Sequence, residues 1–208
     1  MNTSKIFIHG LGQTSSSWND VIGEIENSFC PDLKQFINQK KVTYEVLYEK
    51  FSDYCNQFEK IDLCGISLGA ILALEYTIKN PSKISSLTLI AVQYKIPKLL
   101  FNIQGLIFKI LPKMLFKNQG FTKNDFITLT NSMKYLDFTD QVLEIQCPTL
   151  IICGQKDYPN LKASKKLHRM LMNSKLSIIQ GSKHEVNLEA SKTLSKLLIS
   201  FYLKTPSN

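Results

Sequence analysis

Short apolar runs alternate with stretches of helical periodicity along most of the chain. Runs that are apolar throughout predict strands buried on both faces, and amphipathic helices between such strands are typical of a parallel sheet with helices on both sides. The sequence therefore predicts an α/β fold. The predicted strands cover residues 6–8, 29–33, 61–64, 86–92, 149–153 and 176–179, and the predicted helices cover residues 18–27, 43–58, 68–79, 161–172 and 188–202.

Residues 93–146 interrupt this alternation with a helical pattern that lies between two predicted strands. In the first part of this insertion, apolar side chains fall on one helical face and polar side chains on the other. The apolar face comprises Leu99, Ile103, Leu106, Ile107, Ile110, Leu111 and Met114, and the polar face comprises Lys98, Asn102, Lys109 and Lys113.

Three interpretations of the insertion differ in what its apolar face contacts. A membrane-spanning helix is disfavoured, because Pro97, Pro112 and several lysines interrupt the segment. A helix on a membrane surface fits the lysines opposite an apolar face. A lid over an apolar pocket is favoured, because the sites of open α/β sheets lie beyond the carboxyl ends of strands, where this insertion begins. We therefore expect residues 1–92 and 147–208 to form the core, and residues 93–146 to form a helical cap.

A formal net charge of +8 raises the question of a nucleic-acid partner. Lysines supply nearly all of the basic side chains and are scattered along the chain, and Arg169 is the only arginine. Specific recognition of phosphates and bases relies on the planar fork of arginine. We therefore expect no nucleic-acid partner.

The five cysteines are odd in number and form no C-x-x-C pair. This pattern indicates neither a disulfide framework nor a zinc site, and it fits a reducing compartment. The N-terminal residues lack the apolar region of a signal peptide. We therefore expect a cytoplasmic protein.

The sequence Gly65-Ile66-Ser67-Leu68-Gly69 lies between a predicted strand and a predicted helix. A Gly-x-Ser-x-Gly in this setting is typical of a nucleophile elbow, a turn so tight that the serine backbone is strained. The turn exposes the serine hydroxyl at the end of the strand, and the start of the helix favours negative charge there. The pattern predicts that Ser67 is a nucleophile.

A serine nucleophile needs a histidine base, and the chain has three histidines. His184 follows the last predicted strand, where a base is needed if Ser67 ends a middle strand. His168 lies in a helix beside basic residues, and we expect it to be a solvated surface side chain. His9 precedes Gly10 in the turn after the first strand.

The base in turn needs a carboxylate to orient it. Asp157 is the only acid in the loop that follows the strand at 149–153, although an aspartate there also suits a cap for the next helix. The other candidate strand end, after residues 86–92, offers only Gln93. Asp137 and Asp140 lie in the return of the insertion, where we expect them to cap or pair locally.

The order Ser67, Asp157, His184 and the sequences around these residues resemble the α/β-hydrolases, in particular the lid-bearing esterases, lipases and haloperoxidase-like enzymes. The matching sequences are Ile8-His9-Gly10-Leu11-Gly12 with Trp18, the segment 65–69, Cys147-Pro148-Thr149-Leu150 leading to Gly154 and Asp157, and Gly181-Ser182-Lys183-His184 followed by Val186-Asn187-Leu188-Glu189. The resemblance implies the α/β-hydrolase fold. In this family a hairpin usually precedes the first matching strand. We expect the fold to lack this hairpin and to have a mostly parallel sheet of about six strands.

The resemblance also implies an oxyanion hole, in which two backbone N–H groups bind the negative oxygen of the reaction intermediate. These groups would belong to Leu11 and Leu68, and His9 and Gly10 would shape the loop. Gly10 would also contact the substrate. The other expected substrate contacts are Ile103, Ile107 and Ile110 of the insertion. No metal or organic cofactor is needed.

The resulting hypothesis is a serine hydrolase that cleaves a carboxylic ester or thioester with a hydrophobic acyl or alcohol group. One alternative is a carbon–carbon lyase or synthase of menaquinone-pathway type. Its multiply charged substrates call for arginine clamps, which the single Arg169 does not supply. A non-catalytic binding protein of this fold is another alternative. Weak membrane contact through the lid, acyl chain length and oligomeric state stay open.

Overall fold

A single parallel sheet organises the chain, and the computed structural model describes residues 3–37, 42–97, 111–116 and 121–205. Among these residues the sheet has six strands in the order β2-β1-β3-β4-β5-β6, and every neighbouring pair is parallel. The strands are β1 (Ser4–Ile8), β2 (Ser28–Phe29), β3 (Ile61–Ile66), β4 (Ile84–Ile90), β5 (Thr149–Gly154) and β6 (Ser174–Ile179). The predicted fold class is confirmed.

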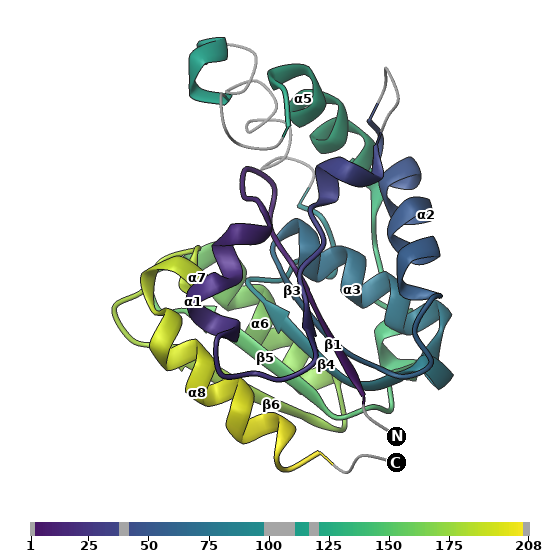
Figure 1. Cartoon of the computed structure of the whole chain (residues 1–208), viewed down its shortest axis with the longest axis vertical. Helices are drawn as coiled ribbons and strands as arrows, with labels where there is room; N and C mark the ends of the chain where they lie inside the picture. The colour runs from purple at the N-terminus through teal and green to yellow at the C-terminus, as the bar shows by residue number, and fades with distance from the viewer. Residues whose placement is uncertain (1–2, 38–41, 98–110, 117–120, 206–208) are drawn as a thin grey trace.

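Helices cover both faces of the sheet (Figure 1). One face packs against α2 (Tyr44–Cys55), α3 (Leu68–Lys79) and α6 (Tyr158–Met170), and the other packs against α1 (Asn19–Ile22) and α8 (Ser191–Tyr202).

Successive side chains along a strand point to opposite faces of the sheet, so the core is divided into two layers. In β1, Ile6 and Ile8 belong to the layer under α2 and α3, whereas Phe7 belongs to the layer under α1 and α8 and packs on Trp18. All three β1 side chains are buried, because side chains of a central strand point to opposite faces of the sheet and both faces are covered. This explains why the run Ile6-Phe7-Ile8 is apolar at all three positions.

Some predicted elements have other bounds in the structure. The strand expected at 29–33 ends at Phe29, because Pro31 lacks an N–H group for the ladder and Asp32 caps the short helix η2 (Leu33–Phe36) by accepting from Lys34 N. The helix expected at 18–27 ends at Ile22 and is preceded by η1 (Ser15–Trp18).

The helix expected at 188–202 is also different, because it is divided in two. A short helix, α7 (Val186–Glu189), precedes α8, and Ala190 lies between them with a non-helical φ of −142°.

The described parts of the insertion are helical and join the core. They contain η4 (Lys113–Phe116), α5 (Lys123–Ser132), η5 (Met133–Tyr135) and η6 (Gln141–Glu144). Another short helix, η3 (Pro81–Lys83), belongs to the core and lies just before β4. Thr122 caps α5 with a capping box. The two ends of the insertion run side by side, since Phe138 N–H donates to Tyr94 O at 2.8 Å. Ile103, Ile107 and Ile110 lie outside the described residues, and the division at 93–146 stays a prediction.

Two glycines permit close approaches between loops at the carboxyl ends of the strands. A Cβ atom at Gly69, in the first turn of α3, would overlap the carbonyl oxygen of Ile8 at the end of β1. A Cβ atom at Gly154, the last residue of β5, would overlap the carbonyl oxygen of Lys183 in the loop after β6. The absence of side chains at these positions allows the loops to lie in contact.

We expect Gly154→Ala to lower the free energy of unfolding by roughly 1–3 kcal/mol, because the added methyl group must displace backbone. Gly23→Ala is the matched control, since a Cβ atom there lies 3.8 Å from its nearest neighbour, Asn19 O. The control should change stability by no more than about 0.5 kcal/mol. Urea unfolding of the three proteins measures both values, and equal stability of Gly154→Ala and the wild type would contradict the prediction.

Candidate active site

Ser67 lies in the turn between β3 and α3 and has an unusual backbone conformation. Its φ is 55° and its ψ is −114°, outside the regions that L-residues prefer. Its N–H group donates to Ile90 O at 2.9 Å, which ties the turn to the end of β4. A Cβ atom at Gly65 would overlap the backbone of Gly69, so this tight turn requires the small residue. Ser67 thus lies in a tight, strained turn, and its role as a nucleophile stays a prediction.

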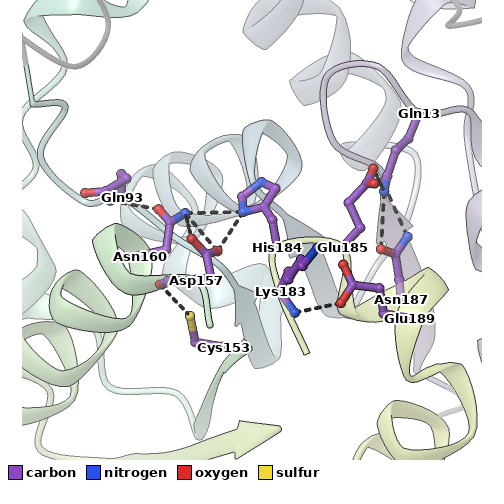
Figure 2. A network of polar contacts seen from close by, with 10 residues as sticks. All are labelled: Gln13, Gln93, Cys153, Asp157, Asn160, Lys183, His184, Glu185, Asn187 and Glu189. Carbon is purple, nitrogen blue, oxygen red and sulfur yellow. Dashed lines mark hydrogen bonds and ion pairs between the residues drawn. The ribbon is translucent and has the colours of Figure 1, made fainter. Parts of the chain in front are cut away.

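Asp157 and His184, in the loops that follow β5 and β6, form a hydrogen-bonded pair (Figure 2). His184 Nδ1 lies 2.7 Å from Asp157 Oδ2. Because an ionised carboxylate only accepts hydrogen bonds, His184 donates from Nδ1, and its Nε2 carries the free lone pair of the neutral ring. Asp157 stands at the N-cap position of α6 but makes no capping hydrogen bond with its side chain, so the capping alternative does not account for it.

The environment of His184 favours its charged form. Burial lowers the pKa of the imidazole, but the hydrogen bond and charge of Asp157, with the charges of Glu185 and Glu189, outweigh burial and raise the pKa above 6.5. The Asp157 side chain is 8% exposed and the His184 side chain is 43% exposed, so the pair has one buried and one accessible partner. This arrangement suits a base that passes through a cationic state.

Ser67, Asp157 and His184 lie after β3, β5 and β6, so the parallel sheet brings them to the same edge. Within the described residues, the Ser67 hydroxyl makes no hydrogen bond to His184 or to any other group. Hydrogen bonds between catalytic groups are often long in the absence of substrate. The structure thus joins the acid to the base, and the contact between base and nucleophile stays a prediction.

The loop after β1 lies against Ser67. A Cβ atom at Gly10 would lie 3.4 Å from Ser67 Cβ. The N–H groups of Leu11 and Leu68 have no hydrogen-bond acceptor among the described residues. Both groups are therefore free to donate, as the predicted oxyanion hole requires.

His9 holds this loop in place. It is completely buried, its Nδ1 donates to Gly10 O at 2.8 Å, and its Nε2 accepts from Leu33 N at 3.0 Å. Burial lowers the pKa of His9, against smaller effects of Gly10 O and Asp32 that raise it. A neutral histidine with both nitrogens occupied fits the predicted role in shaping the loop.

A buried amide network joins this loop to the loop that carries His184 (Figure 2). Gln13 accepts from Gly10 N at 3.1 Å and donates to Glu185 Oε1 at 2.9 Å and to Asn187 Oδ1 at 3.3 Å. Asn187 is completely buried and also donates to Ser17 O at 3.2 Å. Gln13 and Glu185 could not be selected from the sequence, because neither residue type marks a site and their partners are distant along the chain.

A second amide pair, Gln93 and Asn160, contacts the acid. Asn160 Nδ2 lies 2.9 Å from each carboxylate oxygen of Asp157, and Gln93 Nε2 donates to Asn160 Oδ1 at 2.7 Å. In the sequence, Gln93 stands out only as the residue at a strand end that offers no acid, and no local pattern marks Asn160.

No protein-family model and no curated protein matches the sequence. Solved structures are similar over nearly the whole chain. An esterase from Thermogutta terrifontis is 18% identical, with a TM-score of 0.81, and the match covers 99% of this chain and 91% of the esterase. MenH from S. aureus is 18% identical, with a TM-score of 0.81, and the match covers 99% of this chain and 95% of MenH. The chain has the α/β-hydrolase fold. A putative lipase from Acinetobacter baumannii AYE, with a TM-score of 0.79 and 22% identity, covers 98% of this chain and 84% of that one.

Two further properties concern only the residues that the structure describes. None of their helices combines the length and the apolar character needed to cross a bilayer. In the same parts of the chain, no group of three or more His, Cys, Asp and Glu side chains is placed to hold a metal ion.

An NMR titration of the histidine rings should separate His184 from His9. We expect a pKa above 6.5 for His184 and below 6.5 for His9. Asp157→Asn removes the charge that stabilises imidazolium, so it should lower the pKa of His184 and leave that of His9 unchanged. Because a base acts in its neutral form, the ascending limb of any pH–rate profile should move to lower pH in this variant. An unchanged His184 titration would contradict the assigned pair.

Proposed function

We propose that the protein is a serine hydrolase that cleaves carboxylic esters or thioesters. The main support is the Asp157–His184 pair at the carboxyl edge of the same sheet that presents Ser67 in a strained turn. The N–H groups of Leu11 and Leu68, which bond to no acceptor in the part of the chain that the structure describes, lie in the segments next to Ser67. Esterase and lipase neighbours of the same fold agree with this proposal.

The reaction proceeds through an acyl-enzyme. Ser67 Oγ attacks the carbonyl carbon while His184 Nε2 accepts the hydroxyl proton. The N–H groups of Leu11 and Leu68 donate to the oxyanion, and Asp157 stabilises the imidazolium. His184 then gives its proton to the departing alcohol or thiol, which leaves an ester between the acyl group and Ser67.

Water completes the cycle by the same route. His184 takes a proton from a water molecule that attacks the acyl carbon, and returns a proton to Ser67 Oγ as the carboxylic acid leaves. No step requires a metal or an organic cofactor.

The proposed substrate is hydrophobic on its acyl or alcohol side. The predicted cap at 93–146 supplies this expectation through its apolar face, of which Ile103, Ile107 and Ile110 are the proposed contacts. Arg169 is exposed on α6, which gives no arginine clamp for a multiply charged substrate. A small neutral ester or thioester therefore fits better.

A fluorophosphonate probe tests for an activated serine. The wild type should gain one label, read by intact mass, and Ser67→Ala should gain none. His184→Ala should label at least about 1,000-fold more slowly, because the serine loses its base. His168→Ala is the matched control, since His168 bonds Ser174 Oγ on another part of the chain. No labelling of folded wild type would overturn the proposed mechanism.

A series of p-nitrophenyl esters tests the hydrophobic site. Each added CH₂ group that enters an apolar pocket contributes about 0.8 kcal/mol, so kcat/KM should rise about fourfold per carbon until the pocket is filled. The matching thioesters, assayed in parallel, compare the two leaving groups. Fastest turnover of the acetate ester, with steady decline thereafter, would contradict a hydrophobic acyl site.

A further inference from the structure

The Gln93–Asn160 amide pair has no part in the proposed reaction, yet it contacts the acid directly. Asn160 Nδ2 lies 2.9 Å from Asp157 Oδ1 and 2.9 Å from Asp157 Oδ2. It also lies 3.2 Å from His184 Nδ1. The side-chain nitrogens of Asn160 and His184 thus converge on Asp157 Oδ2, and both oxygens of the carboxylate are engaged (Figure 2).

The charge of Asp157 determines the direction of every hydrogen bond in this set. A carboxylate accepts only, so the Asn160 amide must turn its NH₂ group toward Asp157. The Oδ1 atom of Asn160 then faces Gln93, which must present its own NH₂ group, at 2.7 Å. Gln93 therefore holds Asn160 in the one orientation that donates to the acid.

The backbone positions both amides at the carboxyl edge of the sheet. Asn160 lies three residues after Asp157, in the first turn of α6. Gln93 follows β4 after Ala91, a residue with the left-handed φ of 51°. Such a conformation is costly for a residue other than glycine and persists only where the surrounding structure maintains it. The N–H group of Ala91 donates to Ile152 O in β5 at 2.9 Å, so this turn is tied to the strand that leads to Asp157.

We propose that Asn160 and Gln93 are positioning residues for the Asp157–His184 pair. This inference rests on the proposed function. Asn160 occupies both carboxylate oxygens and prevents rotation of the group, so that Oδ2 stays directed at His184 Nδ1. Gln93 acts through Asn160. The pair thereby keeps the proton of neutral His184 on Nδ1 and the lone pair on Nε2, where the reaction needs it.

The proposal is tested by measuring kcat and KM with the best ester substrate for three variants: Gln93→Glu, Asn160→Ala and the double variant. A glutamate at position 93 only accepts, so Asn160 must turn and place its oxygen against Asp157. Each single variant should lower kcat about 10- to 100-fold with KM nearly unchanged, because small misplacement of a reacting group is costly. The double variant should lose no more than Asn160→Ala alone, because Gln93 acts only through Asn160.

Gln155→Glu is the matched control for charge. It adds the same negative charge to the loop after β5, but Gln155 Oε1 accepts from Gly181 N, and a glutamate keeps that bond. Its kcat should stay within about twofold of the wild type. Gln93→Met, which lacks both donor and acceptor, replaces Gln93→Glu if thermal unfolding shows that the latter does not fold.

NMR of His184 gives a second result that needs no turnover. Neutral His184 should carry its proton on Nδ1 in the wild type, and the Nε2–H form should increase in Asn160→Ala. Wild-type kcat in Asn160→Ala, or losses that add in the double variant, would overturn the proposal. If the wild type cleaves no ester, the proposed function fails separately. The tautomer comparison then decides, and an unchanged tautomer would overturn the positioning role.

Discussion

Ser67 holds a backbone conformation that costs about 1–3 kcal/mol, and the surrounding chain is arranged to keep it there. Its N–H group bonds to the end of β4, and the backbone of β1 passes so close to α3 that Gly69 has room for no side chain. The loop that follows β1 rests on the serine side chain at Gly10. The loop after β1 and the end of β4 thus both contact this one strained turn.

Two histidines illustrate how location decides chemistry. His9 and His184 both follow a strand, yet burial lowers the pKa of one and a carboxylate raises the pKa of the other. Both ring nitrogens of His9 form hydrogen bonds with backbone groups, which hold the loop after β1 in place. In His184, Nδ1 bonds to Asp157, and Nε2 forms no hydrogen bond among the described residues. The difference comes from the partners, because the side chain is the same.

The sequence predicted the features that depend on local patterns. Short segments and their order suffice to predict the buried strands, the turn around Ser67 and the loop positions of Asp157 and His184. All six predicted strands are present in the structure. The early end of β2 at Phe29 was missed because the prediction of a strand at 29–33 gave no weight to Pro31 and Asp32, which lie within that segment. The amide networks could not be predicted, since Gln93 and Asn160 are separated by 67 residues and nothing local marks their contact.

The contact between Gln13 and Asn187 joins residues 174 positions apart. During synthesis the loop after β1 is therefore made long before its partner in α7. The link between the loop beside Ser67 and the loop of His184 cannot close until Asn187 has left the ribosome. A growing polypeptide thus carries Ser67 well before the candidate site around it can be assembled.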